Sequence, residues 1–217
     1  MLGRDIYSRT VYGARVSLTV GLCVALLSTG LGLLIGLVTG FSRWTDAIVM
    51  RIMDGLMSIP AVLIAIALMA LTRASLENVV FAITVAEVPR VARLVRGVVL
   101  TQRDLPFVEA AFASGTSLLR ILWRHILPNT LPPLLVQATY VAASAMLVEA
   151  ILSFLGAGTP PNIPSWGNIM AEGRSLFQVA YYIVLFPGAF LSVTVLAINL
   201  LGDGLRDALD PRLARRM

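Results

Sequence analysis

Long apolar stretches that contain no charged residue recur along the chain. A helix needs about 20 predominantly apolar residues to cross a membrane. The cores of soluble proteins rarely use uninterrupted runs of this length, so the pattern indicates a membrane protein. It predicts spanning helices at about 16–41, 55–72, 130–152 and 181–201.

A fifth span is predicted at about 76–94, where the charge-free part covers only 78–86. This span requires Glu77 at one membrane interface, with Glu87 and the arginines that follow it at or near the other. The long arginine stems would then reach toward polar head groups. With this span included, the expected fold is all-α, a polytopic membrane bundle of five transmembrane helices.

The composition agrees with the membrane assignment. Hydrophobic residues make up 58% of the 217 residues and charged residues 13%, about half the share of roughly 25% in an average soluble domain. The mean hydropathy is +0.85. So little charge excludes a soluble enzyme or a disordered tail. The single cysteine, Cys23, lies in an apolar run, which excludes an internal disulfide and a cysteine-cluster metal site; we interpret it as a packing residue.

The arginines between the spans predict the orientation. All 17 basic residues are arginine, and twelve fall on the side of the 87–125 connection against five on the other. Because basic residues concentrate on the cytoplasmic side, the N-terminus is expected outside and the C-terminus in the cytoplasm. The same rule accounts for the sequence pI of 10.1, so no nucleic-acid partner is expected.

Small residues form a stripe on the first span. Ser28, Gly32, Gly36 and Gly40 are four residues apart and therefore share one helix face. Such a face lets another helix approach closely inside a membrane. Packing within this chain is the favoured interpretation, and packing against a different subunit is the alternative.

Two prolines lie inside predicted spans, Pro60 in the second and Pro187 in the fifth. Each removes one helical hydrogen bond and predicts a kink. Kinked helices suit a channel that opens on alternate sides, although kinks also occur without such a function.

Polar residues in or beside the apolar runs are candidates for a substrate pathway, because such residues are costly at membrane depth. Glu149 lies at the end of its run near the outer interface, together with Ser153. It is interpreted either as a solvated or paired structural residue or as a pathway residue. No second carboxylate stands at helical spacing from it, so a proton relay is not supported. The pathway candidates are Gln137, Tyr140, Ser144, Glu149 and Asn199.

The long connection at about 97–127 is predicted to be cytoplasmic and to hold a short helix at 107–113. Thr101 and Asp104 have the spacing of a capping box. Pro106 suits the first turn of a helix.

A second helical piece is predicted at 118–124, after a break at Gly115 and before Pro128, which opens the fourth span. The two short helices carry too much apolar surface for a solvated loop. They therefore imply a partner protein or a lid folded on the bundle.

Within this connection, Glu109-Ala110-Ala111, three further residues, Gly115 and an Ile-Leu-Pro at 126–128 resemble the EAA loop of ABC importer permeases. Flanking words are similar to those of the dipeptide, oligopeptide and nickel branch of that family, and the match runs from about residue 3 to 213. These words are Ala92-Arg93-Leu94-Val95-Arg96, Arg124-His125-Ile126-Leu127-Pro128-Asn129, Leu152-Ser153-Phe154-Leu155-Gly156, Pro164-Ser165-Trp166-Gly167 and Asn199-Leu200-Leu201-Gly202-Asp203-Gly204-Leu205-Arg206-Asp207-Ala208-Leu209-Asp210-Pro211-Arg212.

The resemblance implies a type I ABC importer permease whose EAA loop forms coupling helices that dock on an ATP-binding subunit. Two alanines allow close approach, the glycine supplies a turn, and the glutamate can pair with a basic group. A lid folded on its own bundle is the alternative. The implied coupling residues are Glu109, Ala110, Ala111, Gly115 and Pro128.

The implied partners are a second permease subunit, two ATP-binding subunits or domains, an extracytoplasmic binding protein and the lipid of a prokaryotic inner membrane. The cargo would be a di- or oligopeptide or a related small solute such as nickel. No GxxxxGK[ST] word is present, so ATP would be bound by partners, and neither a cofactor nor enzyme activity is expected in this chain.

Two other classes of function remain as alternatives. A secondary transporter favours internal repeats with paired broken helices, and we find no convincing repeat. An intramembrane enzyme needs facing catalytic groups, and none stands at usable depth.

Three further features of the sequence bear on its interpretation. His125, the only histidine, is interpreted as a structural hydrogen-bonding residue. The external loop 156–174, with Trp166, is either a rim for a substrate-delivering protein or a simple membrane anchor. Relatives of this type usually carry another span before a Leu-Gly-Arg-Asp word, here Leu2-Gly3-Arg4-Asp5, so an upstream helix is expected.

Overall fold

The computed structural model describes residues 5–209, and in that range all regular elements are helical. Leu2–Arg4, and Asp210–Pro211–Arg212 with the arginines after them, lie outside the described residues. The all-α prediction is confirmed. The elements are α1 Ile6–Phe41, α2 Arg43–Thr45, the π-helical turn η1 Asp46–Met50, α3 Arg51–Met57, α4 Ala61–Ala70, α5 Leu76–Arg103, α6 Pro106–Ala113, α7 Leu118–Ile121, the π-helical turn η2 Leu122–Ile126, α8 Leu127–Phe154, α9 Trp166–Gly173, the 3-10 turn η3 Arg174–Leu176 and α10 Tyr182–Leu209.

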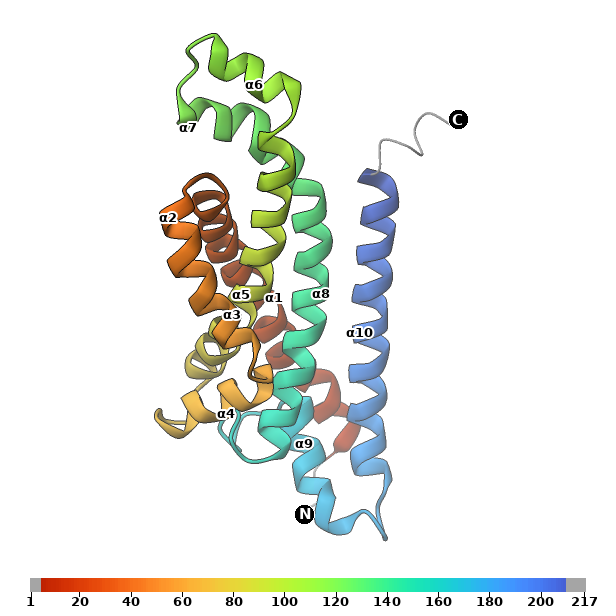
Figure 1. Cartoon of the computed structure of the whole chain (residues 1–217). Helices are drawn as coiled ribbons and strands as arrows, with labels where there is room; N and C mark the ends of the chain where they lie inside the picture. Colours follow the sequence, from red (N-terminus) through yellow and green to blue (C-terminus); the bar gives the residue numbers. More distant parts are fainter. Residues whose placement is uncertain (1–4, 210–217) are drawn as a thin grey trace.

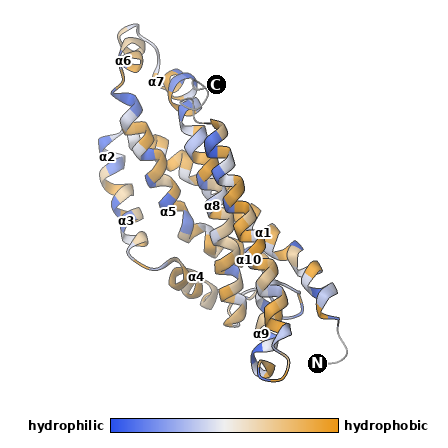
Figure 2. Ribbon diagram, turned by 90° about the vertical axis from the view of Figure 1, so that its right-hand side faces the viewer, coloured by the Kyte–Doolittle hydropathy of each residue, from blue (hydrophilic) through white to orange (hydrophobic). Residues whose placement is uncertain are grey.

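Long apolar helices dominate the bundle. Among the described residues, α1, the continuous run from α7 to α8, and α10 are each long and apolar enough to cross a membrane. Hydrophobic residues predominate along α1 and α10 in Figure 2. These helices contain the predicted spans at 16–41, 130–152 and 181–201. A bent pair, α2–α3 with α4, would make a fourth crossing, while α5 carries too much charge to qualify by composition.

The predicted bend of the second span at Pro60 is a complete break, so the expectation that one kinked helix continues through Pro60 is wrong. α3 and α4 are separate and meet at an angle of 91°. Pro60 is the N-cap residue of α4, so it separates two helices instead of bending one. At this position its missing N–H costs no helical hydrogen bond. Pro187 lies inside α10, which continues through it.

α5 is packed along α1 by the predicted stripe of small residues. A methyl group on Gly32 would lie 2.6 Å from Val91 Cβ, and one on Gly36 would lie 2.5 Å from Val95 Cβ. Gly40 faces Val99 in the same way. Only glycine permits this approach, because Cβ atoms do not come so close. The interpretation of the stripe as packing within the chain is confirmed.

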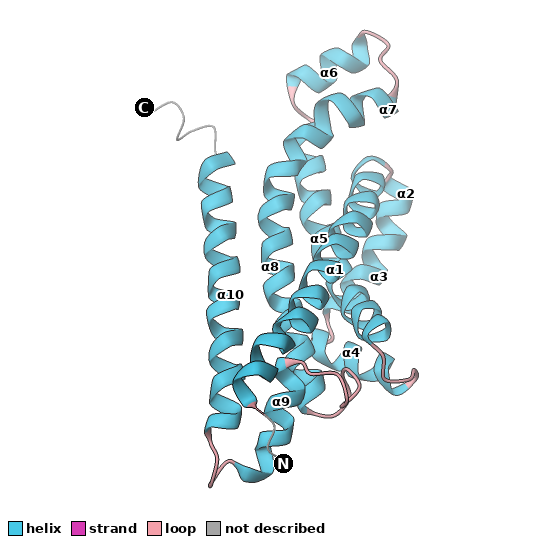
Figure 3. Cartoon of the chain, turned by 180° about the vertical axis from the view of Figure 1, so that it is seen from behind, coloured by secondary structure: helices cyan, strands magenta, loops and turns pink. Residues whose placement is uncertain are grey.

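The two ends of the bundle differ. Figure 1 shows α6 and α7 standing beyond the end where α10 finishes, while α9 closes the end where α1 begins. The view from behind in Figure 3 shows the same arrangement, with α10 beside α8 at the edge of the bundle. The long helices α5 and α8 run between the two ends, and α5 continues through Pro89.

Candidate functional site

The loop between α5 and α8 begins later than predicted, because α5 extends to Arg103. Thr101 lies inside that helix and its hydroxyl donates to the carbonyl of Gly97 at 3.0 Å. Asp104 follows the end of α5, and Leu105 is the N-cap of α6. The capping-box prediction is therefore wrong, since the continuing helix places Thr101 in its last turn.

The turn after α6 forms around Gly115, as predicted. Pro106 opens α6, and the helix ends at Ala113. The N–H of Thr116 donates to the carbonyl of Ala111 at 3.1 Å, and Gly115 has φ +78°. This is the geometry in which a left-handed glycine terminates a helix.

Part of the loop is anchored and the rest is exposed. Val108, Ile121 and Ile126 are fully buried in the main core, and Ala111 packs against it. The opposite surface is open, with Glu109, Ala110 and Gly115 exposed there and Pro128 exposed in the first turn of α8. Large apolar side chains are exposed as well: Phe107, Phe112, Leu118, Leu119 and Trp123.

His125 stands beside this loop as a packing residue. Its ring centroid lies 6.0 Å from that of Phe107, with the two rings tilted. Within residues 5–209, no group of three or more His, Cys, Asp or Glu side chains could hold a metal ion.

A second site lies where α5 meets α8. Arg90 Nη1 donates to Glu87 Oε2 at 3.1 Å, and Ser144 Oγ donates to Glu87 Oε1 at 3.1 Å. The guanidinium carbon of Arg90 is 5.5 Å from the ring centroid of Tyr140. Gln137 lies one helical turn before Tyr140 on α8. We call these five residues the polar face.

The burial of the polar face is uneven. Glu87 is 1% exposed, while the Arg90 side chain is 41% exposed. Tyr140 is half exposed. The carboxylate is thus inside the bundle, and the cation that neutralises it reaches the surface.

Beside Gln137 is a hollow of about 370 Å³ between α5, α8 and α10. The Nε2 atom of Gln137 is buried without a hydrogen-bond partner in the described part of the chain. Arg206 of α10 and Pro133 of α8 also line this hollow. The hollow therefore has a positive charge and an amide side chain in its lining.

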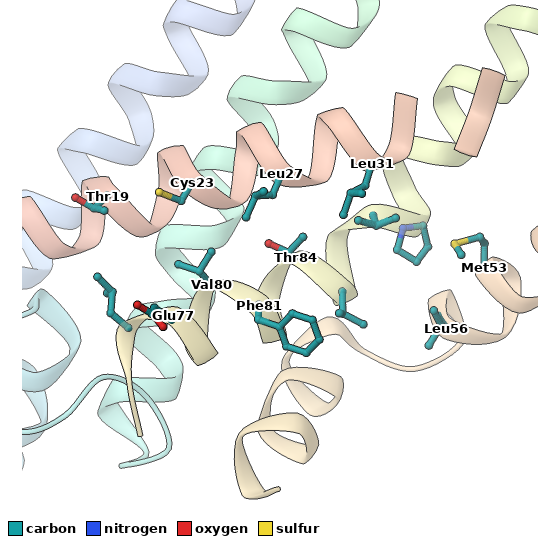
Figure 4. A pocket seen from close by; sticks show the side chains of 14 residues that line it. Thr19, Cys23, Leu27, Leu31, Met53, Leu56, Glu77, Val80, Phe81 and Thr84 are labelled. Carbon is teal, nitrogen blue, oxygen red and sulfur yellow. The ribbon is translucent and has the colours of Figure 1, made fainter. Parts of the chain in front are cut away.

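A larger cavity of about 620 Å³ lies between α1, α3 and α5, beside the α3–α4 bend. Its lining is hydrophobic except for Thr19, Glu77 and Thr84. Figure 4 shows these three among the apolar side chains of α1, α3 and α5. Such a lining suits lipid chains or helix packing better than a polar solute.

The structure brings together only some of the pathway candidates. Gln137, Tyr140 and Ser144 share the polar face, but Glu149 lies elsewhere in α8. Its carboxylate is fully buried and accepts from Ser17 Oγ at 3.2 Å and from Ser153 Oγ at 2.8 Å. This geometry favours the structural interpretation of Glu149. Asn199 is half-buried on α10, a helix that supplies no residue to the polar face.

Sequence reasoning missed Glu87 and Arg90 as site residues, since it placed them at a membrane interface. Their spacing of three residues within an uninterrupted helix could have identified them as a pair. What the spacing does not give is the contact with Ser144, which is 57 positions away in the chain.

Comparison with known proteins identifies the family. The family model described as "Binding-protein-dependent transport system inner membrane component" matches residues 28–215. A protein of Sinorhizobium fredii named as a probable peptide ABC transporter permease is 56% identical over 99% of this chain and 74% of its own length. A dipeptide transport system permease protein DppC of Alkalihalophilus pseudofirmus is 44% identical over 97% of this chain and 70% of its own.

Another relative is the glutathione transport system permease protein GsiD of Pectobacterium atrosepticum, 42% identical over 98% of this chain and 71% of its own length. Among solved structures, a chain of the inward-facing MetNI methionine ABC transporter has a TM-score of 0.77 at 21% identity, covering 96% of this chain and all of that one. This likeness shows the shared fold. The family match and the sequence relatives together show that the chain belongs to the inner-membrane components of binding-protein-dependent transport systems.

Proposed function

We propose that this chain is the permease subunit of an ATP-driven importer of peptides. Relatives at 56% and 44% identity are named for peptide and dipeptide transport, and one at 42% is named for glutathione, itself a short peptide. The earlier alternative of nickel receives no support from these names. The same relatives favour an ABC importer over a secondary transporter or an intramembrane enzyme.

The observation that carries the coupling part of the proposal is the apolar surface of α6 and α7. These helices stand beyond the bundle, and Leu119 of α7 and Trp123 of the following turn η2 are 72% and 71% exposed. A lid folded on its own bundle would bury such side chains. Apolar surface of this kind marks a protein interface. We assign the docking of an ATP-binding subunit to Glu109, Ala110, Ala111, Gly115 and Pro128.

The same assignment gives the orientation and the partners. Because α10 finishes at the end that carries α6 and α7, a cytoplasmic coupling loop puts the C-terminus in the cytoplasm. The α9 end, with loop 156–174, would then face the binding protein. We propose five crossings, with α2–α4 as the broken second and α5 as the third. The complex would contain a second permease and two ATP-binding subunits.

A second permease also accounts for the polar face. An arginine exposed to lipid at depth is costly, whereas one that faces a water-filled path between two subunits is not. Arg90 and Tyr140 would therefore line the path, together with the pathway candidates Gln137 and Ser144. Glu149 and Asn199 are not placed on it.

The test uses the complete transporter in proteoliposomes. Gly115→Leu should abolish most ATP-driven uptake of a labelled dipeptide and weaken co-purification of the ATPase, because a left-handed residue with a bulky side chain distorts the docking turn. The matched control is Gly30→Leu, since Gly30 also has open space around it but lies inside α1. Normal uptake by Gly115→Leu would contradict the coupling role, and uptake driven by an ion gradient without ATP would contradict the importer.

A further inference from the structure

We propose that Arg90 binds the C-terminal carboxylate of the transported peptide, with Tyr140 as the wall beside it. This inference rests on the proposed function, since it names the part of the cargo that the path recognises. It concerns the polar face defined by Glu87, Arg90, Gln137, Tyr140 and Ser144.

The first step is that Glu87 holds Arg90 without competing for a ligand. Both carboxylate oxygens of Glu87 are in use, one with Ser144 Oγ and one with Arg90 Nη1, each at 3.1 Å. At 1% exposure, this carboxylate does not reach the path. Glu87 is therefore a positioning residue that orients the guanidinium and balances its charge while the site is empty.

The second step is a comparison of three arginines on α5. Arg96 is paired with Asp46, whose carboxylate accepts hydrogen bonds from Arg96 Nε and, at 2.7 Å, from Arg96 Nη2. Arg93 is bonded to Asp54 of α3. Arg90 has a hydrogen bond through Nη1 alone among the described residues, and that bond is to its own helix. Its remaining N–H donors are free on the exposed side.

The third step concerns the position of Arg90 along α5. Arg90 lies 14 residues after Leu76, the first residue of α5, which corresponds to about 20 Å along the helix axis. With α5 as the proposed third crossing, a cation this far from the first residue of the helix is costly unless water or an anion supplies its remaining hydrogen bonds. A carboxylate matches the planar fork of a guanidinium with two parallel hydrogen bonds.

Tyr140 defines how a peptide would lie. The guanidinium is within cation–π distance of the Tyr140 ring, which fixes its plane. One turn further along α8, Gln137 lines the 370 Å³ hollow, but its Nε2 is buried and is not offered to a ligand. The last residue of a peptide would thus sit against Arg90 and Tyr140.

The experiment measures ATP-driven uptake of two peptides by the complete transporter, supplied with saturating binding protein. One is Ala-Ala with a free carboxylate, and the other is the same dipeptide with a C-terminal amide. For each peptide, the uptake rate of the variant is divided by the uptake rate of the wild type. Any preference of the binding protein for one peptide then cancels from the ratio. We expect Arg90→Gln to lower uptake of the free acid about tenfold and to change uptake of the amide less than twofold.

Three variants sharpen this result. Arg93→Gln is the matched control, since it removes a charge one turn away whose partner is Asp54, and it should leave both uptakes within twofold. Arg90→Lys should recover part of the acid uptake, because it restores the charge but not the fork. Tyr140→Leu keeps the Glu87–Arg90 pair and should lower acid uptake about threefold.

An equal loss of both peptides in Arg90→Gln would overturn the proposal and leave Arg90 as a structural residue. An Arg90-dependent response to the phosphatidylglycerol content of the vesicles, with no effect of the peptide carboxylate, would overturn it in favour of a lipid head group. Absence of ATP-driven uptake of either peptide by the wild type would instead overturn the proposed function, and the carboxylate site with it.

Discussion

Two buried glutamates, Glu149 and Glu87, show how similar local chemistry serves different ends. Each is no more than 1% exposed, and each accepts a hydrogen bond from a serine on α8. Among residues 5–209, Glu149 has only hydroxyl partners, whereas Glu87 has an arginine that reaches the surface. The first network is closed within the protein, and the second carries its charge to the outside.

The closed network extends into the α9 end of the molecule. Ser153 contacts Thr159 at 3.1 Å, and Asn168 donates to Thr159 Oγ1 at 2.9 Å. Trp166 Nε1 donates to the carbonyl of Thr10 on α1 at 2.9 Å. Because its members satisfy one another, this network fixes the loop after α8 and offers no free group to a ligand. The difference teaches that burial alone does not mark a functional carboxylate; an accessible partner does.

The largest expected effect comes from breaking the closed network. Glu149→Ala removes the acceptor of Ser17 and Ser153 and leaves a void, which should lower stability by roughly 2–4 kcal/mol. The measurement is the thermal unfolding temperature of the purified complex. Glu149→Gln is the control, since an amide oxygen still accepts and the side chain still fills the space. A Glu149→Ala complex as stable as the wild type would show that the network is not structural.

A smaller effect is expected at the open network. Glu87→Gln keeps the size of the side chain but weakens its hold on Arg90, because a neutral acceptor binds a guanidinium less strongly than a carboxylate does. Dipeptide uptake should fall about fivefold, with the unfolding temperature little changed. If stability falls as far as in Glu149→Ala while uptake per folded complex is normal, the contrast between the two glutamates is lost.

The smallest effect is expected from Trp166→Phe. This change removes one hydrogen bond, to Thr10, from the closed network and should cost about 1 kcal/mol. Uptake at low temperature should stay within twofold of the wild type, because the change leaves the polar face intact. The unfolding temperature and the uptake rate, measured on the same preparation, decide whether the α9 end acts only as a scaffold.

Much of the fold was predictable because the length of an apolar run in the sequence indicates the length of a membrane helix. The runs at 16–41, 130–152 and 181–201 and the glycine stripe gave three long helices and one packing face. Local turn chemistry also sufficed for Gly115, whose lack of a side chain permits φ +78°. These features depend on residues close together in the chain.

What failed depends on contacts between distant parts. The break at Pro60 and the extension of α5 to Arg103 result from tertiary packing, which overrides local signals such as the Thr101–Asp104 spacing. The residues of the polar face meet only when α5 and α8 pack in one particular register. That register cannot be deduced from a single sequence. Candidates from the apolar runs therefore mixed residues of the polar face with Glu149, which belongs to the closed network.

The unbroken course of α5 has a mechanical consequence. The helix is continuous from Arg90 to Arg103, a rod of about 20 Å, and two residues then lead into α6. A tilt of roughly 10° applied at the α6 end moves the far end by about 3 Å, comparable to one hydrogen-bond length. Pro89, which lacks an N–H and so removes one helical hydrogen bond, immediately precedes the rod in the chain. The loop of α6 and α7 and the site at Arg90 thus lie at the two ends of one continuous helix, so under the proposed coupling role a displacement of the loop would change the direction in which the guanidinium points.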